Sequence, residues 1–348
     1  MTDDNGKITG ENSHEVIVRP ARAEDRDGAL AFCARIWDGY DYIPHVWDGW
    51  LADTRGALLV AIEREVEHGR ERERPVGLVH VRKVSDDEVW MEGIRVDPDR
   101  RRQGIARRLS SASLAAARER GATVARLMTT HENTASQQLA VGFGYVKVAE
   151  MVRYEAPALE PDVLGEAKES EGETETESES ETTTEGAPRA GISVDVAPGA
   201  RLVIAGPEDF ERVWAWMERS SLLPLTGGLG FGDWSARALS ELDVRAALAE
   251  GRLWQLEEWE TIQALALLEE RPAYTPGESG RLHLRTLDGS SEGIGRLALV
   301  LREEAGRRGL RSVVAWLPNL LILRDAMAGA GYEADEDTPM WVYARDLA

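Results

Sequence analysis

Hydrophobic and polar positions in the first 156 residues follow two periods. Short apolar runs, typical of β-strands, occur at residues 16–18, 57–63, 76–84, 88–96 and 123–130. Apolar residues that recur every three or four positions predict helices over residues 24–37, 105–116 and 134–141. The charged segment 64–74 lies between two of the strands, so we expect a hairpin loop there. The predicted order is β-α-(α)-β-β-β-α-β-α-β.

The second half of the chain repeats landmarks of the first in the same order. "VIVRPARAEDRDGALAF" and "RLVIAGPEDFERVWAWM" both read as strand, turn and helix. Later matches are short, and at nearly constant spacing they pair Gly104 with Gly293, Gly121 with Gly309, Gly144 with Gly331, and "MVRYEA" with "MWVYAR". Such an ordered series predicts a duplicated fold, with domains at 16–156 and 196–348.

An acidic segment separates the two repeats. Residues 156–195 hold 12 acids and 2 bases, and within them 166–188 alternates acid with serine or threonine. So few apolar residues cannot offset the entropy of ordering the chain. We expect a disordered linker over 157–195 and a disordered N-terminus over 1–15, with an acidic protein-binding tail as the alternative for the linker.

Composition narrows the class of protein. The 348 residues are 43% hydrophobic, which supports globular cores, and the net charge of −21 argues against nucleic acid as a partner. A single cysteine, Cys33, on the inward stripe of the first helix, excludes an internal disulfide, and the six histidines lack ligand spacing, so no metal is expected. The acidic, polar N-terminus is not expected to act as a signal peptide, and no apolar run reaches 18 residues. We therefore expect a cytoplasmic protein without a membrane partner, and the oligomeric state stays open.

Arginines gather around one glycine. In "VDPDRRRQGIARRL", residues 96–109, five arginines surround Gly104 at the junction between a strand and a helix. The first amides of a helix have no intrahelical acceptor, and that end carries partial positive charge. The segment therefore predicts an anion site, although it contains neither a P-loop nor a dinucleotide-binding fingerprint.

This segment resembles the pyrophosphate loop of the GNAT superfamily of N-acetyltransferases. Residues 101–106, "RRQGIA", fit the family pattern Arg/Gln-x-x-Gly-x-Gly/Ala. "MEGIRVDP" resembles the family's fourth strand, and "HENTASQQLAVGFGY" its later asparagine-containing motif. The resemblance covers about 16–156 and implies two GNAT-like α/β domains, each a mixed, mostly antiparallel central sheet flanked by helices and joined by the disordered acidic linker.

The resemblance implies acetyl-CoA as co-substrate and a direct attack of an amine on the thioester in a ternary complex. Backbone groups of residues 94–96 would pair with the pantetheine, the loop would hold the pyrophosphate, and Asn133 would touch the pantetheine arm. The cofactor-binding residues implied are Ile94, Arg95, Val96, Arg101, Arg102, Gln103, Gly104, Ile105, Ala106 and Asn133.

Glu92 is the candidate catalytic residue. It lies in mid-strand, where alternation puts it on the face of Trp90 and Ile94. A carboxylate beside the thioester could take the amine proton as general base; the other interpretation is a salt-bridged carboxylate that positions the substrate. The tyrosine that often protonates the thiolate in this family is missing, because Ala140 stands seven residues after Asn133, and Tyr145 fits a packing role better.

The acceptor is a small-molecule primary amine in this interpretation. In the family the region after the first helix lines the acceptor site, which makes Tyr40, Tyr42 and His45 candidate substrate contacts; capping the core is the alternative. "DYIP" and "MEGIRV" resemble a histidine N-acetyltransferase-like branch, which would suggest an amino acid. Protein N-termini and thiol-precursor amines are alternatives within the class, and a non-catalytic acyl-CoA-sensing or scaffold protein is the alternative outside it.

The second copy has lost charge at its loop. Aligned by the repeat, Ser290 replaces Arg101 and Glu292 replaces Gln103, while Gly293 keeps the glycine of the turn. An acid beside a pyrophosphate repels it. We therefore expect residues 196–348 to be a degenerate GNAT-like domain that does not bind acetyl-CoA productively, in a tandem arrangement that resembles mycothiol synthase.

Overall fold

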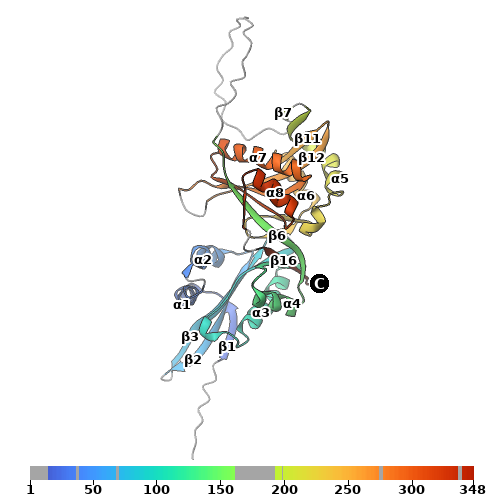
Figure 1. The fold of residues 1–348 in the computed structure, drawn as a ribbon. Helices are drawn as coiled ribbons and strands as arrows, with labels where there is room; N and C mark the ends of the chain where they lie inside the picture. The colour runs from blue at the N-terminus through green and yellow to red at the C-terminus, as the bar shows by residue number, and fades with distance from the viewer. Residues whose placement is uncertain are drawn as a thin grey trace, which may run out of the picture. The chain divides into compact units, whose positions relative to one another are not determined.

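The computed structural model describes residues 15–36, 39–67, 70–160, 193–197, 199–273, 277–335 and 339–348. The chain divides into two compact units (Figure 1). The first unit contains residues 1–128, 134–146 and 343–348, and the second contains 129–133 and 147–342. Of the segments expected to be disordered, residues 1–14 and 161–192 lie outside the described residues. The expected bounds, 1–15 and 157–195, are too wide, because residues 15, 157 and 193–195 lie in strands.

The first unit follows the predicted order of elements up to its last helix. Its strands β1 to β5 form a sheet in sequence order, antiparallel except for the parallel pair β4 and β5. The helices are α1 (Arg26–Cys33), α2 (Ile43–Ala52), α3 (Ile105–Glu119) and α4 (Thr134–Gly142). The strands are β1 (Glu15–Pro20), β2 (Ala57–Glu67), β3 (Arg70–Lys83), β4 (Glu88–Val96) and β5 (Val124–Thr130).

The prediction of a hairpin loop over residues 64–74 is wrong. Strands β2 and β3 continue through this segment in antiparallel register, and only residues 68–69 lie outside the described chain. Arg64 faces Glu73, and the Arg64 Nε lies 3.2 Å from the Glu73 Oε1. Opposite charges that face each other across two strands stabilise the pairing, so a strongly charged segment can form a hairpin.

The second unit repeats this architecture, as predicted, with a mixed and mostly antiparallel sheet. The strand order is β6-β14-β13-β12-β11-β8-β7, and β13 and β14 are parallel. The sheet strands are β6 (Val146–Pro157), β7 (Ser193–Ala197), β8 (Ala200–Ile204), β11 (Leu253–Glu258), β12 (Thr261–Arg271), β13 (Arg281–Gly289) and β14 (Ser312–Pro318). The other elements are α5 (Phe210–Met217), β9 (Leu229–Phe231), β10 (Ala236–Ala238), α6 (Glu241–Ala249), α7 (Ser291–Arg307), α8 (Leu321–Gly329) and β15 (Glu333–Ala334).

Each unit takes a strand from the other half of the sequence. Strand β6, which ends the first repeat, pairs antiparallel with β14 of the second unit. The final strand of the chain, β16 (Met340–Asp346), lies next to β5, and residues 343–348 belong to the first unit. The Leu347 amide donates to the Thr123 carbonyl at 2.8 Å, and the Leu347 side chain is buried. The terminal strands are therefore exchanged within one chain.

The hydrophobic core of the first unit lies between helices α1 and α2 and the sheet. Residues of α1 and α2, including Phe32 and Trp47, pack on the buried strand residues Val60 and Leu78. Cys33 is fully buried in this core, and burial raises the pKa of its thiol to about 12. A thiol with this pKa stays protonated near neutral pH, which fits the place of Cys33 on the inward stripe of the first helix.

Candidate active site

Strands β4 and β5 begin together and then separate. Their parallel pairing covers only Glu88–Trp90 against Val124–Arg126. Beyond Trp90 the β4 edge that faces β5 makes no ladder hydrogen bonds to it, and residues 92–96 are half-buried. Backbone groups on such an edge need a partner. The predicted pantetheine-binding residues Ile94, Arg95 and Val96 lie on this edge.

A β-bulge accompanies the separation. Leu78 pairs with Arg95 but His80 pairs with Glu92, so β4 holds one extra residue. Gly93 adopts φ +68°, and a Cβ there would come within 2.4 Å of the Trp50 ring. A bulge bends its strand and increases the twist. It also breaks the simple alternation expected over Trp90, Glu92 and Ile94, which corrects the sequence interpretation beyond Glu92.

The predicted pyrophosphate loop ends at an uncapped helix. Gly104 is the N-cap of α3 with φ +78°, a left-handed conformation that favours glycine, and no side chain caps the helix there. A Cβ built on Gly104 would have no neighbour within 4 Å, so the space in front of the backbone is open. The amides of Ile105 and Ala106 begin the helix and have no intrahelical acceptors. This end of α3 can bind an anion.

Two of the five arginines around Gly104 have guanidinium groups without a hydrogen-bonding or ion-pair partner among the described residues. The side chains of Arg101 and Arg102 are exposed and make no hydrogen bond or ion pair with the described residues. The other three have partners: Arg100 with Glu63, Arg107 with the Phe143 ring, and Arg108 with the Val16 carbonyl. Arg101 and Arg102 therefore leave positive charge available beside the open helix end.

A buried carboxylate anchors the start of this loop. Asp97 has no exposed side-chain surface and accepts hydrogen bonds from Arg35 and, at 2.5 Å, from Arg74. It also accepts from the Asp99 amide at 3.1 Å. Both of its oxygens are thus bonded, and the chain between β4 and α3 leaves the sheet in a fixed direction.

Glu92 lies in a polar cluster that sequence reasoning only half identified. Its side chain is 14% exposed. The Oε1 atom lies 2.9 Å from His80 Nδ1, and the Oε2 atom lies 3.1 Å from an Arg82 terminal nitrogen. The salt bridge of the alternative interpretation is therefore present, while each carboxylate oxygen keeps a further lone pair.

His80 is the functional candidate that the sequence did not reveal. It is 1% exposed, and its ring stacks on Trp50 with centroids 4.6 Å apart. Its Nε2 atom lies 3.3 Å from Asp53 Oδ2. The only available sequence signal was a histidine inside an apolar strand, and its register with Glu92 depends on the bulge.

Of the predicted substrate contacts, the structure brings only Tyr42 into the cluster. The Tyr42 and Trp50 rings meet edge to face with their centres 6.0 Å apart, and the Arg95 guanidinium lies over the Tyr42 ring at 5.3 Å from its centre. Tyr40 is 91% exposed, and His45 is exposed on α2. The polar partners of Glu92 are His80 and Arg82, and neither Tyr40 nor His45 is hydrogen-bonded or ion-paired to it.

Arg95 is held in place by a buried acid. Asp41 accepts two hydrogen bonds from the Arg95 guanidinium, at 2.7 and 3.1 Å. It also accepts one from the Ile43 amide at the start of α2. This pair links the predicted acceptor segment to β4.

The later motif lies at the end of β5. Asn133 directly precedes α4, and its amide donates to the Thr130 carbonyl at 3.2 Å. Ala140 is buried in α4, so the position of the missing tyrosine holds only a methyl group. Tyr145 is buried too, and burial raises the pKa of its hydroxyl, which suits the packing role predicted for it.

Residues 28–145 match the family model described as Acetyltransferase (GNAT) family. This match falls almost entirely in the first unit, which is therefore similar to a GNAT domain and is called the GNAT domain below. A histidine N-acetyltransferase from Oreochromis niloticus is 32% identical over 87 residues, which are 25% of this chain and 23% of that protein. The chain thus spans about a quarter of the length of this curated relative.

Two solved structures share the fold over almost the whole chain. A GCN5-related N-acetyltransferase from Sphaerobacter thermophilus is 14% identical with a TM-score of 0.53, and the match covers 95% of this chain and 96% of that one. The glucosamine N-acetyltransferase region of a fungal multi-domain β-N-acetylglucosaminidase is 14% identical with a TM-score of 0.51, covering 95% and 38%. These likenesses show a fold that extends beyond the GNAT domain into the second unit.

Neither a membrane helix nor a metal cluster emerges from the part of the chain that the structure describes. None of the helices there has both the length and the apolar character needed to cross a bilayer. No three histidine, cysteine, aspartate or glutamate side chains among the described residues are grouped to hold a metal ion.

The second unit lacks the open helix end of the GNAT domain. Only Ser290 separates β13 from α7, and its hydroxyl caps the helix by accepting from the Gly293 amide at 3.1 Å. The equivalence of Gly293 with Gly104 is therefore wrong. Gly293 lies in the first turn of α7, where a Cβ would come 2.7 Å from the Gln263 carbonyl, so close packing requires glycine there.

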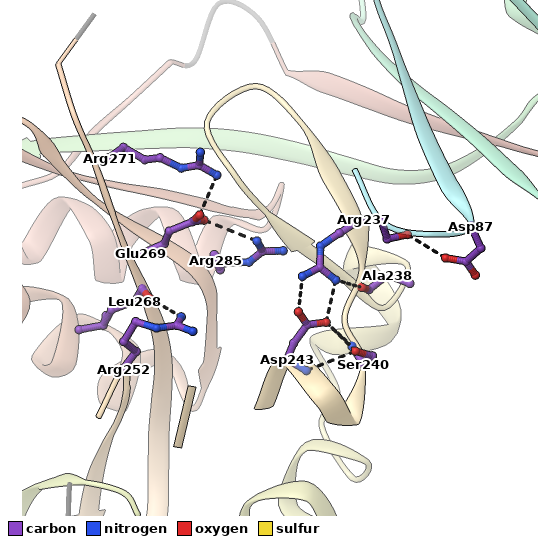
Figure 2. A network of polar contacts seen from close by, with 11 residues as sticks. Asp87, Arg237, Ala238, Ser240, Asp243, Arg252, Leu268, Glu269, Arg271 and Arg285 are labelled. Atoms are coloured by element: carbon purple, nitrogen blue, oxygen red, sulfur yellow. Dashed lines mark hydrogen bonds and ion pairs between the residues drawn. The ribbon is translucent and has the colours of Figure 1, made fainter. Parts of the chain in front are cut away.

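An arginine stands where the bulge of the second sheet occurs. Leu267 pairs with Thr286 but Leu268 pairs with Leu284, which leaves Arg285 as the extra residue. Figure 2 shows Arg285 and Arg271 on either side of Glu269, with ion-pair distances of 3.5 and 2.8 Å. Burial lowers the pKa of the Arg285 guanidinium. No carboxylate equivalent to Glu92 occupies the bulge itself.

Proposed function

We propose that the GNAT domain binds acetyl-CoA and transfers its acetyl group to the primary amine of a small molecule. The observation that carries this proposal is the unpaired edge of β4, which runs toward the uncapped N-terminus of α3. The backbone of residues 94–96 would pair with the pantetheine. The amides of residues 102–106, with Arg101 beside them, would hold the pyrophosphate, and Asn133 would contact the pantetheine arm.

The reaction we propose is a direct attack in a ternary complex. The amine nitrogen forms a bond to the acetyl carbon, and the bond from that carbon to sulfur breaks. Glu92 takes a proton from the substrate ammonium, so that the nitrogen has a free electron pair. Water protonates the departing thiolate, because Ala140 offers no acid, and the hydroxide that forms takes the second proton that the nitrogen loses as the amide forms. A purely positioning role for Glu92 is the alternative that a pH profile distinguishes.

For the acceptor we propose an amino acid. Arg82 is half-buried beside Glu92, and its guanidinium could bind an acceptor carboxylate while Glu92 receives the amine. Tyr42 and Trp50 supply an aromatic wall next to this pair. The name of the histidine N-acetyltransferase relative agrees with this class of acceptor. Tyr40 and His45 remain proposed contacts at the exposed rim.

The test is release of free CoA from acetyl-CoA in the presence of amino acids, polyamines and peptides. We expect release with at least one amino acid, and a rise in its KM when Arg82 is replaced by glutamine. Release with peptides alone would move the acceptor to a protein N-terminus. Binding of acetyl-CoA by calorimetry without release for any amine would overturn the enzyme and favour an acyl-CoA sensor.

A further inference from the structure

His80 joins two carboxylates that otherwise do not meet. Its Nδ1 atom lies 2.9 Å from Glu92 and its Nε2 atom 3.3 Å from Asp53. The ring is 1% exposed, whereas Glu92 is 14% and Asp53 24% exposed. A line of three ionisable groups therefore runs from the candidate base through a buried imidazole to a carboxylate that water can reach.

The packing around His80 keeps the ring in this orientation. Trp50 stacks on it at an angle of 12° between the planes, and Leu58 of β2 lies opposite it in the sheet. The charged groups that face the cluster are Glu92 from β4, Asp53 after α2, and Arg82 from its own strand. A histidine that served only to fill the core would need neither carboxylate.

The Nε2 atom of His80 has an unusual position. It is buried and has no partner aligned as a hydrogen bond, although Asp53 lies at ion-pair distance. Asp53 Oδ1 is already committed, because it accepts from the amides of Arg55 and Gly56 at 2.9 and 3.0 Å. Its Oδ2 atom thus faces a buried imidazole nitrogen, an arrangement that becomes favourable when that nitrogen carries a proton.

We propose that His80 and Asp53 form a proton path that carries the acceptor's proton from Glu92 to solvent. This inference rests on the proposed acetyl transfer. The balance is simple: an ammonium and a thioester give an amide, a thiol and one free proton. Glu92 receives that proton, His80 takes it on Nδ1 and releases one from Nε2 to Asp53, and Asp53 passes it to water. His80 and Asp53 act through Glu92 and are positioning residues.

Kinetics of isosteric variants test the path. His80→Gln keeps a polar amide beside Glu92 but cannot relay a proton, so we expect kcat to fall about tenfold or more with unchanged acetyl-CoA affinity. Raising the imidazole buffer concentration should restore part of this rate, which loss of packing alone would not allow. Asp53→Asn retains its amide acceptor and should lower kcat several-fold, about threefold to tenfold by the same relation. Asp86→Asn removes an exposed carboxylate from the β3–β4 turn and should match the wild type.

Two kinetic results would overturn the path. One is His80→Gln with wild-type kcat at every pH and buffer concentration. The other is a slow His80→Gln that buffer does not rescue, together with a wild-type rate for Asp53→Asn; His80 would then act through packing.

An NMR experiment that does not require catalytic turnover separates this inference from the proposed function. Nitrogen-15 NMR of the histidine rings reports the protonation of each ring nitrogen of His80 between pH 5 and 9. We expect Asp53→Asn to change the Nε2 signal or its titration, and Asp86→Asn to leave both as in the wild type. If the wild type releases no CoA with any amine, the proposed function fails, but the NMR experiment still tests the contact between His80 Nε2 and Asp53. An Nε2 signal indifferent to Asp53→Asn overturns the path.

Discussion

Two pairs of parallel strands, β4–β5 in the GNAT domain and β13–β14 in the second unit, separate in the same way but are covered differently. Residues 92–96 of β4 are half-buried, and β5 is mostly half-buried. In the second unit Thr286, Leu287 and Asp288 are buried beyond the paired segment, and every residue of β14 is buried. The same sheet geometry therefore leaves an accessible edge in one unit and a packed interior in the other.

The covering segment in the second unit is residues 222–231. Leu229 and Phe231 of β9 are buried, and the Phe231 ring stacks on Trp316 of β14 at 5.9 Å. What remains is a small cleft lined by Leu222, Leu223, Thr226, Leu229, Phe231, Arg285, Thr286, Leu287, Asp288 and Trp316. Burial raises the pKa of Asp288 there. We therefore expect the split to hold a cofactor in the GNAT domain, where α3 begins without a side-chain cap, and not in the second unit.

The largest effect should come from the strand that completes the GNAT domain. Leu347 is 5% exposed, so Leu347→Ala should lower the free energy of unfolding of this domain by about 2–5 kcal/mol. Leu321→Ala is the matched control, because that side chain is 75% exposed and its loss should cost less than about 0.5 kcal/mol. Chemical denaturation, with acetyl-CoA binding as the readout of the folded GNAT domain, measures the stability of both variants. Equal stability of the two variants would contradict the strand exchange.

Next in size is the contrast between Glu92 and Arg285, the residues at the two bulges. Glu92→Gln keeps the shape and removes the base, so kcat should fall about 100-fold or more while acetyl-CoA still binds. The acid limb of the pH–rate profile should also disappear. Arg285→Gln should leave kcat unchanged. Wild-type kcat for Glu92→Gln at every pH would limit Glu92 to a structural role.

A smaller effect is expected at the helix end. Gly104→Val puts a side chain where the pyrophosphate would lie and strains a left-handed backbone, so acetyl-CoA affinity should fall at least about tenfold. Gly121→Ala controls for backbone strain, because Gly121 has φ +77° at the other end of α3 with open space around it. In calorimetry the wild type should saturate near one acetyl-CoA per chain. Two equivalents, or unchanged affinity in Gly104→Val, would refute the assignment.

The smallest effect concerns the capped N-terminus of α7 in the second unit. Ser290→Ala removes the N-cap of α7 and should lower the stability of that unit by about 1 kcal/mol. Acetyl-CoA affinity should stay at the wild-type value, since the cofactor would bind elsewhere. A change in affinity would mean that the second unit contributes to the site.

Much of the candidate site could be proposed from the sequence because its signals are local. The glycine at the start of α3, the arginines beside it and the mid-strand carboxylate are each visible within a few residues. His80 was missed because its partners, Glu92 and Asp53, come from two other segments. The repeat alignment misplaced Gly293 because the connections differ in length. Eight residues separate β4 from α3, whereas one separates β13 from α7, and sequence similarity alone does not reveal this difference.

The sequence by itself determined the order of strands and helices, the duplication, and the place where a helix end meets positive charge. Periodicity and glycine positions act over short stretches, so local physics is enough for them. Only the tertiary structure decided which strand completes each unit, that a bulge at Gly93 turns Glu92 toward His80, and that residues 222–231 close the second split. These features depend on contacts between segments far apart in the chain, where burial and packing, and not local propensity, select the arrangement.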